Sequence, residues 1–328
     1  GNNGAEYTGN IISNLSNTNS SGGAVKVYGM IYAPTATVNL TYPKFERNWI
    51  YNLSTQSNGT TTVVGGMLIS GGININLYNN MISLGSTQTQ NAILNGIEQT
   101  SGGVTAYFNS VRMTGTASGG ASDAIAYNYN VASGSAFTLR NNLLYNDRTG
   151  GTGQKFALRM SMGAIPAYDA TRGSHNLLYS AGANFAQFGA INYNTLAGWS
   201  GACGGGDPAT TSKTAQVAFT TATDLHTSDL DVRNCGIAIA GVTNDFDNTV
   251  RPACIDIGCD ETVVVPGTTY TWVGAIDDRW CEPCNWDRES VPGATDNAVI
   301  PPSKVRYPVL QTGTGCGNVT INDFTVQF

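Results

Sequence analysis

Acidic side chains are scarce in the first two hundred residues, and their spacing decides whether they could cleave a glycosidic bond. The acids between residues 10 and 200 are Glu46, Glu98, Asp123, Asp147 and Asp169. Such cleavage needs two or three carboxylates, or carboxylates with a basic residue or calcium, converging on one face. When the internal repeats are aligned, Glu98 falls opposite Ala126. Asp123 falls opposite Asn95, so the two acids are expected on opposite faces, and no catalytic residue is predicted.

The other titratable side chains of the coils are predicted to be structural. Asp147 stands beside Arg148, where a solvated turn with a surface ion pair is expected. His175 occupies a corner position that is Asn in most other repeats, and His226 lies in a later loop. Both are expected to form hydrogen bonds rather than to catalyse, because no Ser-His-Asp arrangement follows from their spacing.

Asp245 and Asp247 are the candidates for a metal site. Their carboxylates could supply oxygen ligands to calcium, but this segment has no Glu at the loop end as an EF-hand has. A capped turn explains the same residues without an ion. No other cofactor is predicted.

All seven cysteines lie after residue 202, so the first two thirds of the chain must hold together without cross-links. The acidic, Asn-rich and Lys-poor composition suits an exported protein, and oxidising compartments preserve disulfides. The disulfide candidates are Cys203, Cys235, Cys254, Cys259, Cys281 and Cys284. The odd count leaves one thiol free or paired outside this segment. The alternatives are a zinc-thiolate set built from Cys254, Cys259 and the Cys281–Cys284 pair, or a redox Cys-x-x-Cys pair, which lacks the usual strand–helix surroundings.

Two groups of aromatic residues could stack on sugars or pack in a core. Trp272, Trp280 and Trp286 lie in Pro-rich surroundings that favour a small hydrophobic core over a sugar platform. Evenly repeated side chains on a flat sheet can form an extended binding surface without a pocket. On that ground, Tyr127, Tyr129 and Tyr145 are the candidates for an outward strip that contacts glycans or a partner.

Composition excludes two classes of function. Only 12% of the residues are charged and the net charge is -6, so no basic surface is available to neutralise a phosphate backbone, and nucleic acid is not an expected partner. The apolar runs are far shorter than the roughly 20 residues that cross a bilayer, so no membrane span is predicted. We expect both ends to be cuts within a longer polypeptide whose export signal is not in this chain.

The chain repeats itself with a period of 30 to 38 residues. Six matching segments start at Asn10, Asn48, Asn79, Asn109, Asn141 and His175. A second column runs through Met30, Met67, Ile97, Ile125 and Leu158. A third column alternates apolar and polar residues with strand periodicity, at Val38–Leu40, Ile75–Leu77, Val104–Ala106 and Phe137–Leu139.

Three short strands per repeat, without a convincing amphipathic helix, indicate an all-β, right-handed parallel β-helix. A propeller blade needs four strands and a longer period, and a leucine-rich repeat is shorter with one strand. Asn and Gly suit the coil corners because both tolerate a left-handed backbone, and stacked Asn side chains can bond between coils.

The end of the repeats resembles a known family. After the loop containing His226 come Asp245-Phe-Asp247, Arg251-Pro252 and Asp256-Ile-Gly-Cys-Asp-Glu261. This order resembles right-handed parallel β-helix proteins exported by Bacteroidetes-type bacteria, whose distal cap closes with an Asp-Ile-Gly-x-Asp-Glu signature. Cys259 stands where that family usually has Ala, which fits a local bridge between Cys254 and Cys259. The Trp-rich part resembles β modules of large surface proteins, many of them cargo of the type IX secretion system.

Four parts are therefore expected. They are β-helix coils at 1–200, a disulfide-containing C-terminal cap at 201–262, a linker at 263–269, and an incomplete Trp-rich β module at 270–328. The resemblance implies export to the cell surface and contacts with other surface or outer-membrane secretion proteins.

The predicted function is a non-catalytic, adhesin-like or structural segment of a larger secreted protein, with polysaccharide as a candidate ligand. The alternative is a polysaccharide lyase or glycoside hydrolase of the β-helix class. A third hypothesis is that the segment is a secretion passenger whose main contacts are with the export machinery.

Overall fold

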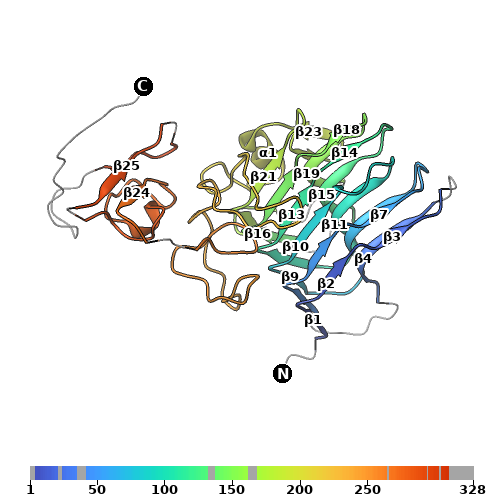
Figure 1. Ribbon diagram of the computed structural model, residues 1–328, viewed down its shortest axis with the longest axis horizontal. Coiled ribbons are helices and arrows are strands. Elements are labelled where there is room, and N and C mark those ends of the chain that lie inside the picture. Colours follow the sequence, from blue (N-terminus) through green and yellow to red (C-terminus); the bar gives the residue numbers. More distant parts are fainter. Residues whose placement is uncertain are drawn as a thin grey trace.

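The structure is a computed structural model, and it describes residues 4–20, 24–34, 42–131, 137–161, 168–263, 266–293, 295–302 and 304–309. The described chain winds into a β-solenoid whose coils stack through three parallel sheets (Figure 1). The first sheet contains β1 (Glu6–Thr8), β5 (Lys44–Glu46), β9 (Ile75–Tyr78), β12 (Val104–Tyr107), β16 (Phe137–Arg140) and β20 (Gly173–Ser174). The second contains β2 (Ile11–Ser13), β6 (Trp49–Tyr51), β10 (Met81–Leu84), β13 (Ser110–Met113), β17 (Leu143–Asn146) and β21 (Leu177–Ser180).

The third sheet has seven strands. It contains β4 (Lys26–Tyr32), β8 (Val63–Ser70), β11 (Ile93–Ser101), β15 (Ala124–Tyr129), β19 (Lys155–Met160), β22 (Ala186–Phe188) and β23 (Ile191–Tyr193). All of its neighbours are parallel except β22 and β23, which are antiparallel. The predicted all-β fold with three stacked strands per coil is confirmed. Short pairs add β3 (Ser16–Asn17) with β7 (Ser54–Thr55), and β14 (Thr116–Ala117) with β18 (Thr149–Gly150).

The register of the coils corrects the Asn column of the sequence alignment. In the second sheet Asn80, Asn142 and Asn176 lie in line with Asn10, Asn48 and Asn109, one residue after the predicted positions. The predicted Asn79, Asn141 and His175 instead take the preceding left-handed corner, with φ of 53°, 58° and 55°. Sequence similarity could not separate these positions, because Asn suits both a left-handed corner and a ladder. In the third column, Val38–Leu40 lies outside the described residues, and the first described strand there after β1 is β5.

The aligned asparagines form a hydrogen-bonded ladder that is buried from Asn48 onwards. Each side-chain amide donates to the Oδ1 of the next Asn, at 2.8 Å from Asn48 to Asn80 and 2.9 Å from Asn109 to Asn142. Each Oδ1 also accepts the backbone N–H of the previous Asn. The side chains therefore link successive coils where the backbone turns, and they satisfy polar groups that would otherwise be buried without partners.

A bend in the third sheet decides which side chains enter the core. The pairing of β8 with β11 joins Gly65 to Asn95 and Met67 to Ile97, and an added Cβ on Gly66 would stand 2.5 Å from the carbonyl oxygen of Gly96. The backbones therefore approach too closely for a side chain here. Beyond the bend, the column continues from Ile97 to Tyr127, so the predicted member Ile125 is wrong by two residues.

The C-terminal end of the coils is closed by a short helix. Helix α1 (Leu196–Ala202) begins at Thr195, whose side chain accepts the N–H of Gly198, and it buries Leu196 and Trp199. Both side chains join the main core. The helix crosses the boundary expected at residue 201, because its apolar face covers the last coil. It is too short to span a membrane, and no described helix is long and apolar enough to do so.

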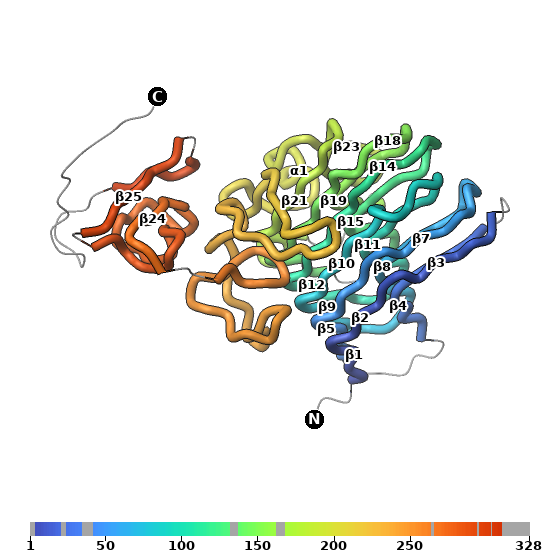
Figure 2. Tube along the Cα trace, viewed as in Figure 1, coloured from blue at the N-terminus to red at the C-terminus, as the bar shows by residue number. Residues whose placement is uncertain are grey.

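Residues 208–262, here named the lateral cover, lie along the flank of the coils rather than over their end (Figure 2). Trp49 Nε1 donates to the carbonyl of Thr223 at 3.0 Å, and Ser83 Oγ donates to that of Ala222 at 2.6 Å. At the other end, Lys213 pairs with Leu177 of β21. The cover therefore runs back along the second sheet and buries its outward apolar side chains.

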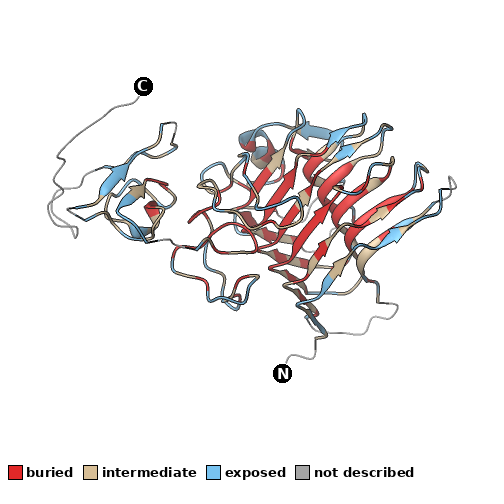
Figure 3. Cartoon of the chain, viewed as in Figure 1, coloured by how far each residue is buried: buried red, intermediate tan, exposed pale blue. Residues whose placement is uncertain are grey.

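A small module follows the cover, built around β24 (Thr269–Thr271), β25 (Asn297–Val299) and the 3₁₀ turn η1 (Pro283–Asn285). Trp272 and Trp286 are fully buried and pack edge to face, with ring centroids 5.1 Å apart. The ring of Trp280 lies 4.7 Å from that of Trp286. The predicted tryptophan core is thus observed, and burial leaves Trp272 and Trp286 with no face for a sugar. Figure 3 shows that the strands of the solenoid are also largely buried.

Candidate functional site

The three tyrosines predicted to form an outward strip are buried. Tyr127 and Tyr129 point into the main core, and Tyr127 donates to Gln99 Oε1 at 2.9 Å. Tyr145 packs outside the coils, but Phe219 and Val217 of the lateral cover bury it. The prediction of a tyrosine binding strip is therefore wrong. The prediction of exposure is wrong for Tyr127 and Tyr129 because the bend in the third sheet turns them inward. It is wrong for Tyr145 because a distant segment of the chain covers this side chain.

Asp147 forms an ion pair, but its partner is not Arg148 as predicted. Arg112 of the previous coil donates to Asp147 at 2.5 Å. Arg148 points inward, is 4% exposed, and donates to three backbone carbonyls, those of Gly85, Thr114 and Gln88. Burial lowers the pKa of Arg148 to about 10. Adjacent residues at a strand end point to opposite sides, so Asp147 and Arg148 face away from each other. Asp147 pairs instead with Arg112, which lies beside it in the neighbouring coil.

Glu98 and Asp123 belong to one hydrogen-bonded network on the outer face of the third sheet. Glu98 is in register with Asn128, and not with Ala126 as predicted, so the expectation of opposite faces is wrong. Asn95 donates to Glu98 at 2.9 Å, Asn128 donates to Asn95 at 3.2 Å, and Arg159 donates to Asn128 at 3.2 Å. Arg159 also donates to Asp123 at 2.7 Å.

The groups of this network, here named the outer polar network, already have partners. Tyr28 Oη donates to Glu98 at 2.5 Å, and burial together with Glu98 raises the pKa of Tyr28 far above its ordinary value. Asp123 accepts a second bond from the backbone N–H of Gln154 at 2.8 Å. Asp169, the remaining acid of the later coils, accepts from Thr171 instead. A carboxylate held by an arginine is a poor general acid, because the ion pair favours its charged form.

One disulfide is formed among the described cysteine pairs, and it differs from the expected local bridge. Cys254 is bonded to Cys284 of the module, whereas Cys203, Cys235 and Cys259 are free and buried. Those three disulfide candidates are therefore wrong. Cys281 is also disulfide-bonded, and Cys316 lies outside the described residues. The disulfide at Cys254 and Cys284 removes the thiolates that the zinc alternative requires.

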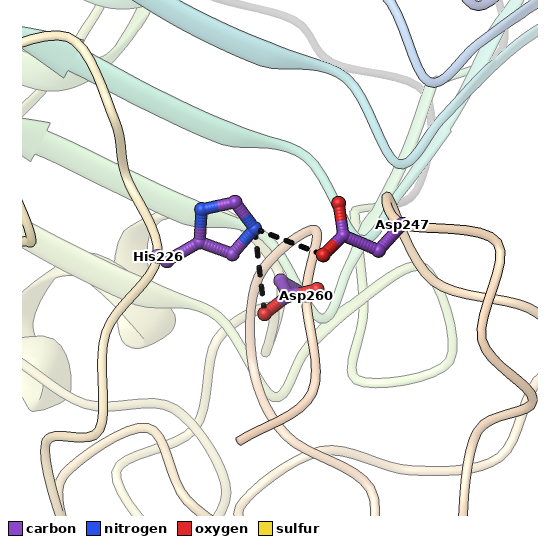
Figure 4. A group of neighbouring side chains, drawn as sticks. All are labelled: His226, Asp247 and Asp260. Atoms are coloured by element: carbon purple, nitrogen blue, oxygen red, sulfur yellow. Dashed lines mark ion pairs between the residues drawn. The ribbon is translucent and has the colours of Figure 1, made fainter. Parts of the chain in front are cut away.

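The predicted metal residues separate into different environments. Asp245 is buried, and its Oδ1 accepts the backbone N–H of Thr249 at 2.8 Å, as in the capped turn considered from the sequence. Asp247 is exposed and faces His226, with Oδ2 at 3.7 Å from Nε2 (Figure 4). Asp260 approaches the same nitrogen at 3.7 Å. These three side chains could together hold a cation, and Asp245 is not part of this cluster.

Asp260 is the residue that the sequence did not suggest. It belongs to the Asp256–Glu261 segment, whose other acids have different functions: Asp256 accepts the N–H of Asn234, and Glu261 pairs with Arg251. Burial raises the pKa of Asp260 to about 7. The only signal was the Asp-Glu pair that ends the signature, and nothing in the sequence indicated which of the two faces the histidine.

A cleft of about 650 Å³ lies where the last coils, the lateral cover and the module meet. Its wall includes Lys213, Lys304 and Arg306, with one carboxylate, that of Asp231. His175 also lines it, and burial lowers the pKa of this histidine to about 4, so it is neutral at pH 7. The cleft therefore presents more positive than negative charge to a ligand.

Comparisons with family models, with curated proteins and with solved structures gave no match to this chain.

Proposed function

We propose that this chain is a non-catalytic structural segment of a larger exported protein, in which the solenoid acts as a rigid spacer at the cell surface. The observation that carries the proposal is the Asn ladder, which joins the coils from Asn10 to Asn176 through side chains that are buried from Asn48 onwards. Hydrogen bonds between side chains of successive coils resist bending of the solenoid, which suits a rigid rod.

The acids of the coils support the same proposal. Asp147 and Asp123 are each held by an arginine, and Glu98 accepts from Tyr28 and Asn95. A glycosidase pair needs one acid with a raised pKa and one free base across the scissile bond. Neither role suits Asp123 and Asp147, whose charges are paired with arginines, and Glu98 already accepts two hydrogen bonds.

Export is supported by the disulfide between Cys254 and Cys284, since such bonds persist in oxidising compartments. The resemblance to Bacteroidetes-type surface proteins adds the cell surface and the type IX secretion system to the proposal. Other surface or outer-membrane secretion proteins are then the partners. A role as a passenger of the secretion system is compatible with this proposal.

Glycan contact, where it occurs, is assigned to the outer polar network and the cationic cleft instead of the buried tyrosines. Arg159 and Glu98, which are partly exposed, offer a donor and an acceptor on an extended sheet face, which suits sugar hydroxyl groups. Lys213 and Arg306 in the cleft favour acidic polysaccharides.

The test is a glycan array run beside an assay for new reducing ends and unsaturated products on neutral and acidic polysaccharides. We expect no product, and any binding should weaken at least tenfold in Arg159→Ala or in Lys213→Ala. Product formation at a rate proportional to protein concentration would overturn the non-catalytic proposal.

The alternative, a polysaccharide-degrading enzyme, is favoured by one observation: Glu98 and Asp123 share a face and a network. Glu98→Gln and Asp123→Asn separate the two functions. For an enzyme both substitutions abolish product formation. For a structural segment they leave polysaccharides untouched and alter only binding.

A further inference from the structure

We propose that His226 Nε2, Asp247 and Asp260 bind one divalent transition-metal ion of the zinc class, which fastens the lateral cover together. The site does not depend on the proposed function, because its three ligands lie in loops of the lateral cover and not in the coils.

The ligand atoms are spaced for a small divalent ion. Nε2 of His226 lies 3.7 Å from Oδ2 of Asp247 and 3.7 Å from Oδ2 of Asp260, and all three ligand atoms lie within 4.8 Å of one another. Zinc bonds of about 2.0–2.2 Å in a tetrahedron place neighbouring ligands roughly 3.3–3.6 Å apart. The two nitrogen–oxygen distances therefore need to shorten only slightly to hold the ion, and a water could supply the fourth position.

The histidine is oriented to present a lone pair at this point. Nδ1 of His226 is hydrogen-bonded to Asp224, and the ring packs edge to face on Phe246 at 5.8 Å between centroids. A carboxylate on one ring nitrogen keeps the proton there and leaves the other nitrogen free as a ligand, as in carboxylate–histidine–metal sites. Asp224 is thus a positioning residue.

An independent observation points to a missing ligand. Nε2 of His226 is shielded from solvent and has no hydrogen-bond partner among the described residues. A protonated ring would need an acceptor within about 3.2 Å, and the nearest carboxylate oxygens in the cluster lie at 3.7 Å. This gap is too long for a hydrogen bond, and it lies close to the spacing of two ligands of one ion.

The donor set selects the class of ion. One imidazole and two carboxylates suit zinc and related transition metals, whereas calcium requires six to eight oxygens. The calcium site considered from Asp245 and Asp247 is therefore replaced by a transition-metal site from which Asp245 is absent.

The ion would cross-link three segments that lack regular structure. His226, Asp247 and Asp260 come from separate loops of the lateral cover, in which the structure describes no helix or strand. The disulfide at Cys254 joins the cover to the module, and no described disulfide joins these three loops to one another. A metal supplies the cross-link that such a segment otherwise lacks.

The experiment uses the full chain after treatment with a chelator. Zinc is titrated against a chromophoric competitor, and cobalt is then substituted to observe its d–d absorption. We expect one ion per chain, a thermal midpoint that rises with zinc, and no displacement by millimolar calcium. Failure to bind one equivalent would overturn the site, and it would leave the structural function of the solenoid untouched.

Variants distinguish this site from surface binding. His226→Asn and Asp247→Asn should each weaken zinc at least a hundredfold. The side chain of Asp247 is 62% exposed, so we expect its substitution to leave the fold intact. Asp224→Asn should weaken zinc tenfold to a hundredfold and shift the cobalt spectrum. His175→Asn is the matched control and should bind normally. Equal affinity in the His226 and His175 variants would contradict the proposal.

Discussion

The side-chain amide of Asn176 donates to Oδ1 of Asp207 at 2.7 Å, and this bond ends the Asn ladder. Oδ1 also accepts from Ser212, while Oδ2 accepts from Tyr168 and from the indole of Trp199. A repeating Asn file always leaves one unsatisfied amide at its end, and a carboxylate, which only accepts, satisfies it. The bond from Trp199 also fixes helix α1 against the last coil.

Interior rungs of the ladder should contribute more stability than the first rung. Asn109 accepts both the backbone N–H and the side-chain amide of Asn80, and it donates to Asn142 and to two backbone carbonyls. Asn109→Ala leaves several buried groups without partners, at about 1–3 kcal/mol for each. Asn10→Ala, at the exposed edge, should cost under about 1 kcal/mol. Urea unfolding of both variants checks the difference, and equal losses would contradict a cooperative ladder.

Arg251 should fasten the lateral cover to the coils. Its guanidinium lies 3.8 Å from the ring centroid of Phe108, donates to Asn79 Oδ1 at 2.8 Å, and pairs with the buried Glu261. Arg251→Ala leaves an uncompensated buried carboxylate and should cost about 3–5 kcal/mol. Arg279→Ala removes two exposed ion pairs and should leave the stability nearly unchanged. Denaturant unfolding measures both, and limited proteolysis should cut the cover first in the Arg251 variant.

Peptide mapping without reduction should recover Cys254 linked to Cys284. The loop between them spans 30 residues, for which chain-entropy arguments give about 3–4 kcal/mol. A Cys254→Ser, Cys284→Ser double variant should therefore loosen the module from the cover, as hydrogen exchange in residues 270–293 would detect. The third sheet serves as the internal control and should exchange as before. A peptide joining Cys254 to Cys259 would contradict the structure.

Stability should fall at acid pH because of His175. Burial, with help from Arg140, lowers the pKa of His175 to about 4, below its ordinary 6.5. The unfolded chain then binds a proton that the folded chain does not, so this stability is present above pH 6.5 and is lost as the pH falls towards 4. His175→Asn, which suits the same left-handed corner, should flatten the midpoint of urea unfolding between pH 6.5 and 4.5. An unchanged pH profile in His175→Asn would show that His175 is not the source of the loss of stability.

The sequence alone determined the coils. A period near thirty residues, alternating strand patterns and recurrent Asn were enough to predict three parallel sheets, because stacking in register makes each coil repeat the environment of the previous one. Similarity between repeats could not fix the register, since Asn suits both the corner at Asn79 and the ladder at Asn80.

Tertiary structure decided everything that depends on contacts across the coils. Tyr145 lies outside its coil, and only the return of the lateral cover buries it; Cys254 bonds to a cysteine of another module; Asp260 meets His226 across two loops. These contacts join segments with no repeat and no regular structure, where distance along the chain carries no information about distance in space. Periodicity specifies a fold only where each unit packs against a copy of itself.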